Sequence, residues 1–201
     1  MAVPSPKLTP DEYLTRERAA EFKSEYWQGE IFAMAGASLP HDVIQGNVKF
    51  QARLHLSPGK CSAHGSDREV GVHRGRHGFA YPDAFILCGP PQFYDSHRDV
   101  VTNPVVILEV LSPTTEAYDR GRKFAEYRKL ASLRHYVLIS PDRMLVEHFA
   151  KQSSDRWLLE DIDPGGTLRF PDLPLEIPIA LLYERVEFPP ANPADGPGES
   201  A

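Results

Sequence analysis

The sequence predicts one α/β domain that is built on a mixed β-sheet and flanked by helices. Helical and strand-like segments follow one another without the sustained alternation of a doubly wound fold, and 201 residues are about the length of one domain. The composition, 41% hydrophobic and 25% charged, is ordinary for a globular protein. Two short apolar runs, 79–88 and 104–111, each carry one acid inside an otherwise apolar pattern. We therefore expect a buried sheet with two acids in it.

The N-terminal part predicts two helices with a hairpin between them. A Thr-Pro-x-Glu pattern at residues 9–12 combines an N-cap, a first-turn proline and a capping-box acid, and it predicts a helix over about 10–22. Gln28-Gly29 separates two apolar segments and predicts a two-residue hairpin turn. Glu25 is expected where the chain passes from the first helix into this hairpin. Apolar residues at helical spacing predict the second helix over about 38–56.

The rest of the chain predicts the centre of the sheet and a third helix. The expected elements, in chain order, are strands at 61–73, 79–88 and 104–111, a helix at about 115–132, strands at 135–140, 143–150 and 156–162, and a short helix at 178–184. Residues 1–188 are thus expected to form the domain. Residues 189–201 are rich in proline, glycine and small residues, and they predict a disordered tail.

Charge, hydropathy and cysteine usage exclude several classes. No apolar run approaches the ~18 residues of a membrane span, and the first residues lack the pattern of a signal peptide, so we expect a cytoplasmic protein with no membrane partner. Cys61 and Cys88 lack a metal-binding spacing, and we expect two reduced structural thiols. The formal charge of -6 argues against non-specific coating of nucleic acid but permits a local basic cleft.

The two acids are the strongest chemical signal. Side chains alternate along a strand, so Asp83 is expected to share a face with Phe85, and Glu109 with Ile107 and Leu111. A buried ionised carboxylate needs a metal, a cation or a hydrogen-bond donor to compensate it. Two carboxylates are typical ligands of Mg2+, which can activate water and stabilise charge on a phosphoryl group. A turn-capping role for Asp83 and an ion pair between Glu109 and an arginine remain alternatives.

Lys123 is the candidate cation. It borders the apolar face of the predicted third helix together with Tyr127. From there it either reaches back to the acids or extends to solvent, as lysines beside an apolar helix face usually do.

The order of these residues resembles the Uma-two family of restriction endonucleases, which belongs to the PD-(D/E)XK nuclease superfamily. The resemblance covers roughly residues 7–186. The residues that carry it are Glu25-x-x-x-Gly29-Glu30, His41, Tyr81-Pro82-Asp83, Glu109-Val-Leu-Ser-Pro113 and Asp119-x-x-x-Lys123-x-x-x-Tyr127.

The resemblance implies a restriction-endonuclease-like mixed sheet with an antiparallel hairpin extension, and Mg2+-dependent hydrolysis of DNA with Mn2+ as an alternative ion. Asp83 and Glu109 would ligate the metal with the backbone carbonyl of Val110. Lys123 would orient or activate the attacking water, and Glu25 would assist from the first helix. A homodimer would suit the cutting of both strands of a duplex.

Two positions depart from the family pattern. Leu111 stands where the superfamily has a lysine two residues after the glutamate, so that role would move to Lys123 or be lost. Gln28 stands in the hairpin turn where an acid or Asn is expected.

His41 either lines the cleft or caps the second helix. Two other functions stay open: an inactive nucleic-acid-binding or interaction module of the same fold, and a metalloenzyme acting on small phosphorylated molecules.

Overall fold

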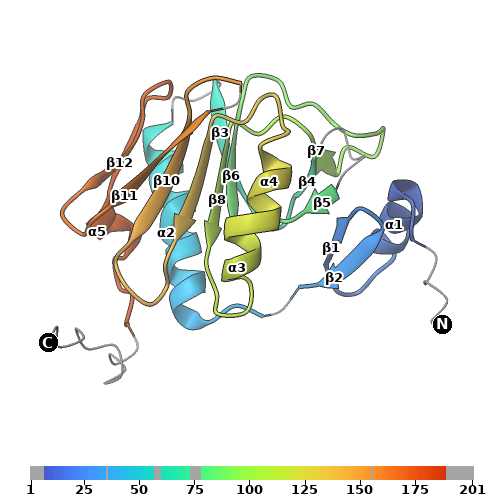
Figure 1. The fold of residues 1–201 in the computed structure, drawn as a ribbon, viewed down its shortest axis with the longest axis horizontal. Coiled ribbons are helices and arrows are strands. Elements are labelled where there is room, and N and C mark those ends of the chain that lie inside the picture. Colours follow the sequence, from blue (N-terminus) through green and yellow to red (C-terminus); the bar gives the residue numbers. More distant parts are fainter. Residues whose placement is uncertain (1–6, 35, 57–59, 73–77, 155, 189–201) are drawn as a thin grey trace, which may run out of the picture.

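The computed structural model of the chain describes residues 7–34, 36–56, 60–72, 78–154 and 156–188. Its centre is a six-stranded sheet with packing elements on both faces (Figure 1). In spatial order its strands are β11 (Trp157–Ile162), β10 (Val146–Lys151), β9 (His135–Ile139), β8 (Val106–Val110), β6 (Ala84–Cys88) and β3 (Cys61–Gly65). β8 and β9 run parallel and the other neighbours run antiparallel. The predicted mixed sheet is therefore confirmed.

A second, five-stranded sheet contains the N-terminal hairpin. In spatial order its strands are β2 (Glu30–Ala33), β1 (Ser24–Trp27), β5 (Gly78–Ala80), β4 (Glu69–Val72) and β7 (Val100–Val101). The turn of the β1–β2 hairpin is confirmed, with positive φ angles of 52° at Gln28 and 98° at Gly29. Gly29 tolerates such an angle without cost, which explains a glycine at this position.

The division into two sheets corrects two of the predicted strands. The expected strand at 61–73 is split by a turn at Ser66-Asp67 into β3 and β4, which lie in different sheets. The expected strand at 79–88 is split at Tyr81-Pro82-Asp83 into β5 and β6, again in different sheets. Proline has no N–H for the ladder, so Pro82 favours a break at this point.

One face of the six-stranded sheet is covered by α2 (Leu39–His55) together with α5 (Ile179–Leu182) and the hairpin of β12 (Thr167–Phe170) and β13 (Leu175–Pro178). Ile44 and Val48 of α2 are buried in one apolar cluster with Ile86 and Leu108 of the sheet. The predicted helices at 38–56 and 178–184 are confirmed, although the second is shorter.

The opposite face carries a helical segment and the five-stranded sheet (Figure 1). Phe85, Ile107 and Leu111 lie in the buried cluster of this face, as the strand alternation predicted for the face that bears the two acids. The helical segment consists of α3 (Glu116–Tyr118), the π-helix η1 (Asp119–Lys123) and α4 (Phe124–Tyr127). The prediction of one helix over 115–132 is thus wrong in two respects: the segment contains a π-helical turn, and its last helix ends at Tyr127.

Helix α1 (Pro10–Glu17) begins with the predicted capping box but is shorter than 10–22. Its last residue accepts hydrogen bonds from Ser24, through N–H to Oε1 at 2.9 Å and Oγ to Oε2 at 2.6 Å. These bonds join the helix end to the first residue of β1, so the chain leaves the helix early. Residues 189–201, for which a tail was predicted, lie outside the described residues.

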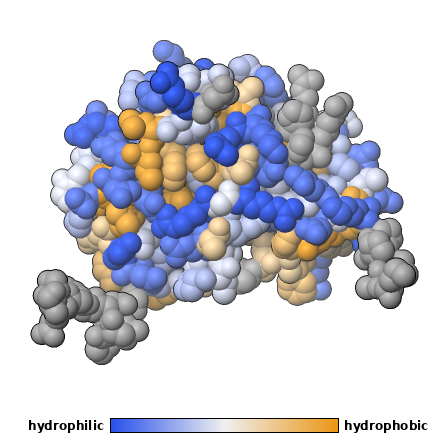
Figure 2. Space-filling model, viewed as in Figure 1, coloured by the Kyte–Doolittle hydropathy of each residue, from blue (hydrophilic) through white to orange (hydrophobic). Residues whose placement is uncertain are grey.

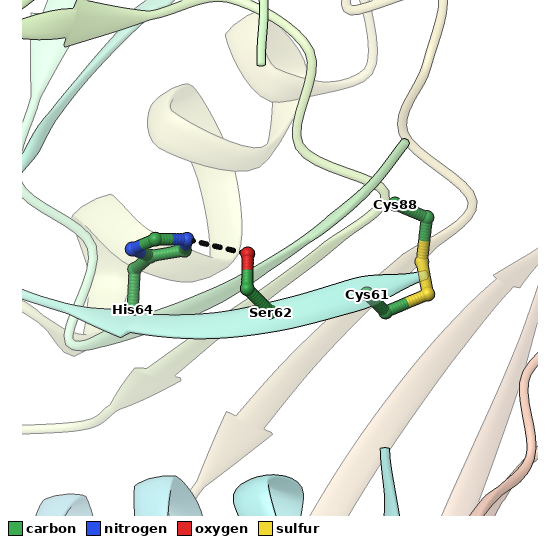
Figure 3. The surroundings of a disulfide bond; sticks show 4 residues. All are labelled: Cys61, Ser62, His64 and Cys88. Atoms are coloured by element: carbon green, nitrogen blue, oxygen red, sulfur yellow. Dashed lines mark hydrogen bonds between the residues drawn. A yellow bond between two sulfur atoms is a disulfide. The ribbon is translucent and has the colours of Figure 1, made fainter. Parts of the chain in front are cut away.

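The prediction of two reduced thiols is wrong, because Cys61 and Cys88 form a disulfide (Figure 3). The two residues are register partners at the ends of β3 and β6, with Cα atoms 4.1 Å apart. Strand register brings them together across 27 residues of sequence, and their spacing in the chain does not reveal it. Among the described residues, no helix is long and apolar enough to cross a membrane.

Candidate active site

The two predicted acids meet at the junction of β6 and β8. Asp83 directly precedes β6, and Glu109 lies in β8, its antiparallel neighbour. The backbone N–H of Asp83 donates to Glu109 Oε2 at 3.3 Å, and the N–H of Val110 donates to Asp83 Oδ2 at 2.8 Å. Each carboxylate is therefore held by the backbone of the other strand.

Glu109 is almost fully buried, with 3% of its surface exposed. Burial raises its pKa, while the ammonium of Lys123 acts in the opposite direction and Asp83 adds to the increase. Its Oε1 atom accepts a hydrogen bond from the hydroxyl of Tyr127 at 3.1 Å and lies 3.0 Å from Lys123 Nζ. Both carboxylate oxygens are thus occupied, and the side chain has a fixed orientation.

Lys123 is buried and does not extend to solvent; 8% of its side chain is exposed. Its Nζ lies 3.1 Å from Glu25 Oε1 and 3.6 Å from Asp119 Oδ1, in addition to Glu109. Burial by itself would lower the pKa of Lys123, but the surrounding carboxylates outweigh it and raise the pKa well above its ordinary value. The lysine is therefore a protonated cation that compensates several buried acids.

The π-helical turn explains how Lys123 reaches this position. It is the last residue of η1, directly before α4. A π-turn adds a residue to the helical repeat, so side chains within it and after it point in directions that a regular helix would not give. Such single turns are frequent at functional sites.

Glu25 joins the site from β1, and the prediction that it lies on or beside the first helix is corrected. Its Oε2 accepts a hydrogen bond from Trp27 Nε1 at 3.3 Å, and its Oε1 from the backbone N–H of Tyr81 at 3.3 Å. Trp27 is fully buried and packs against Gly78, where an added Cβ would lie 2.2 Å from its ring. The glycine makes room for the indole ring whose N–H contacts Glu25.

Helix α2 contributes two side chains to the other side of Asp83. Gln45 Nε2 donates to Asp83 Oδ1 at 3.1 Å, and His41 Nε2 lies 3.1 Å from Asp83 Oδ2. Burial would lower the pKa of His41, but Asp83 outweighs it and raises the pKa; the carbonyl of Val110 contributes in the same direction. Ser38 provides the side-chain cap of α2, so His41 lines the site and is not the capping residue.

All of the sequence-predicted site residues are therefore in one cluster: Glu25, Asp83, Glu109, Val110 and Lys123. Leu111 is buried in the apolar cluster below it, so no cation stands at that position.

Two contributors to the site were not predicted from the sequence, the side chain of Gln45 and the hydroxyl of Tyr127. Gln45 stands four residues after His41, on the same face of α2, and this spacing could have identified it.

Two buried polar side-chain atoms lack a hydrogen-bond partner within the described ranges, His41 Nδ1 and the hydroxyl of Tyr118. In the same ranges, no group of three or more His, Cys, Asp or Glu side chains is arranged to hold a metal ion. The predicted ligand set is of a different kind, because it has two carboxylates and one backbone carbonyl.

Comparison with known proteins shows the family and the fold of the chain. Residues 10–181 match the model of the Uma2 family, described as "Putative restriction endonuclease". Two uncharacterized proteins of Synechocystis sp. are similar: one is 32% identical over 93% of this chain and 97% of its own length, the other 36% identical over 77% and 87%. A crystal structure described as a putative nuclease belonging to DUF820, from Anabaena variabilis, has the same fold, with a TM-score of 0.71 and 20% identity over 88% of this chain and 98% of that one. The chain belongs to the Uma2 family and has its restriction-endonuclease-like fold.

Proposed function

We propose that this protein is a Mg2+-dependent endonuclease that hydrolyses phosphodiester bonds of DNA. The observation that carries the proposal is the position of Lys123, whose Nζ lies 3.0 Å from Glu109 Oε1 although Leu111 occupies the usual lysine position. The cation is thus retained from a different element. A DNA substrate is supported by the description of the family as restriction endonucleases.

The groups near this lysine include oxygen donors of the kind that a hard divalent cation binds. The carboxylates of Asp83 and Glu109 and the carbonyl of Val110 offer oxygen atoms, the ligand type that Mg2+ and Mn2+ prefer. His41, which pairs with Asp83, has a buried Nδ1 with no partner within the described residues, and a water or substrate group could satisfy it. When bound, Mg2+ lowers the pKa of a coordinated water and stabilises negative charge on a phosphoryl group.

The chain's own residues would position and compensate the reacting groups. Because the pKa of Lys123 is raised, its ammonium would act as a hydrogen-bond donor and a positive charge, and not as a base. It would orient the attacking water and offset charge in the transition state. Glu25 would hold the ammonium from β1, since its Oε1 lies 3.1 Å from Nζ. Tyr127 would keep Glu109 in place through its hydroxyl.

A cytoplasmic location, where DNA is accessible, is part of this proposal. The Cys61–Cys88 disulfide is a feature that is uncommon in that compartment.

The test is a cleavage assay on plasmid DNA, single-stranded DNA and RNA, with Mg2+, with Mn2+ and with a chelator. The wild type is expected to cleave DNA in a metal-dependent way, and Asp83→Asn is expected to lose this activity. Glu176→Gln, at an exposed position of β13, serves as the control and should cleave like the wild type. Equal cleavage by wild type and Asp83→Asn would show that Asp83 and its site do not carry out the cleavage.

A second candidate is a module of the same fold that binds nucleic acid without cutting it. It is favoured by the closed network, in which Lys123 already compensates Glu109 and Glu25 without any further cation. A wild type that binds DNA but cleaves no nucleic acid with any divalent metal would favour this candidate.

A further inference from the structure

Strand β2 is an unprotected edge of the five-stranded sheet. All four of its residues are exposed, and its surface is apolar, with 41% of Ile31, 38% of Phe32 and 39% of the following Met34 accessible. Figure 2 shows apolar surface at the lower right, where Figure 1 places the β1–β2 hairpin. Exposed apolar residues on an edge strand favour pairing with another strand.

The hairpin register shows which backbone groups are free. Trp27 pairs with Glu30 across a two-residue turn, and the N–H of Met34 donates to the carbonyl of Lys23 at 3.2 Å. In an antiparallel pair the bonded positions alternate, so Glu30, Phe32 and Met34 bond to the β1 side. The N–H and C=O groups of Ile31 and Ala33 consequently point outward, and no other described segment forms a backbone hydrogen bond with them.

The other long edge differs in a way that supports this reading. β11, an edge strand of the six-stranded sheet, exposes 57% of Leu158 and 48% of Leu159, but it also carries Glu160 and Asp161 among its exposed residues. Charges on an edge strand discourage pairing with another chain. β2 has one charge, Glu30 at its start, and that charge pairs with Arg122 of the same molecule at 3.4 Å.

We propose that β2 pairs antiparallel with β2 of a second copy of this chain, across a two-fold axis at Phe32. In this register the outward groups of Ile31 meet those of Ala33 in the partner, which forms four backbone hydrogen bonds. Glu30 lies opposite Met34 of the partner and the two Phe32 rings are neighbours, so no like charges face each other and an aromatic pair forms. Residues 1–6 of the same chain are a poor alternative occupant, because Pro4 and Pro6 lack the N–H that such pairing uses.

The pairing would bring two candidate active sites into one assembly. Glu25 of β1 is the register partner of Phe32 of β2. Each cluster of site carboxylates therefore lies one strand away from the proposed axis. The inference does not depend on nuclease activity, because it concerns the oligomeric state alone.

Two matched proline variants test the interface. Ala33→Pro removes an N–H that points outward. Because Ala33 makes no backbone hydrogen bond to β1, the hairpin should be retained. Leu159→Pro is the control. The N–H of Gln152 donates to the carbonyl of Arg156, which fixes the bonded positions that alternate along β11. The N–H of Leu159, on this edge strand, therefore also points outward. Sedimentation over a concentration series should give a dimer for wild type and Leu159→Pro and a monomer for Ala33→Pro. A monomeric wild type, or a dimeric Ala33→Pro, would overturn the proposal.

A cysteine cross-link tests the register independently of proline tolerance. The two native cysteines are joined in a disulfide, so an introduced cysteine is the free thiol of the molecule. At the axis, Phe32→Cys places two Cα atoms about 4.5 Å apart, within disulfide range, whereas Glu30→Cys places them roughly 14 Å apart. Mild oxidation should convert Phe32→Cys, and not Glu30→Cys, to a covalent dimer. Equal cross-linking of both, or of neither, would contradict the register.

Discussion

Replacing Lys123 with alanine removes the cation that lies between Glu109 and Glu25. Its Nζ is 3.0 Å from one carboxylate and 3.1 Å from the other, with 8% of the lysine side chain exposed. The variant leaves buried carboxylates without their counter-charge, and removing one member of a buried ion pair typically costs about 3 to 5 kcal/mol. We therefore expect the free energy of unfolding to fall by about that amount at neutral pH.

The loss should depend on pH. Burial already raises the pKa of Glu109, and removing the lysine removes an influence that lowers it. A carboxyl whose pKa is raised in the folded state contributes stability when it is protonated and loses it as the pH rises. The difference between wild type and Lys123→Ala should thus be smaller near pH 5 than near pH 8.

Urea denaturation at several pH values measures this effect, with Lys23→Ala as the matched control. Lys23 also pairs with a carboxylate, Asp67 at 2.7 Å, but both side chains of that pair are exposed, 42% for Lys23 and fully for Asp67. Exposed pairs contribute about 0 to 1 kcal/mol, so the control should be nearly neutral. If both variants lose less than about 1 kcal/mol, Lys123 does not compensate buried charge.

Three further predictions concern stability. Burial raises the pKa of Glu69 to about 8, so the wild type should lose stability relative to Glu69→Gln as the pH rises from about 5 to about 8; a difference in urea midpoint that does not change with pH would contradict this. The double variant Cys61→Ser, Cys88→Ser opens a disulfide across 27 residues and should lose about 3 kcal/mol, measured by urea denaturation under non-reducing conditions; an unchanged midpoint would argue against the disulfide. Gly78→Ala should displace the ring of Trp27 and cost about 1 to 3 kcal/mol, visible as a lower Tm and a shifted tryptophan emission; wild-type values for both would contradict the packing.

The local patterns of the sequence were sufficient for the hairpin at Gln28-Gly29, for α2 and for the faces of Asp83 and Glu109. Turn chemistry, helical spacing and strand alternation act over a few residues, so they can be read without the fold. The helical pattern indicated Lys123 as a candidate cation, and the family resemblance gave it a role and added Glu25; the structure brings both to the acids.

Long-range features could not be predicted in the same way. β5 and β6 read as one apolar run because both are buried, although Pro82 lies between them and they belong to different sheets. The Cys61–Cys88 bond follows from strand register. The π-turn before Lys123 does not appear in a helical pattern of 3.6 residues, so the sequence left open whether this lysine is buried or exposed.

Divalent-metal binding at the carboxylate cluster tests the central claim most directly. Glu109→Gln is close to isosteric, and since burial already favours the neutral form of Glu109, the variant should fold. A bound ion at about 100 times its Kd stabilises the native state by about 2.7 kcal/mol. We predict that Mn2+ or Mg2+ raises the Tm of the wild type and of Glu176→Gln but not of Glu109→Gln. The same rise in all three proteins, or no rise in the wild type, would contradict a metal site at Asp83 and Glu109.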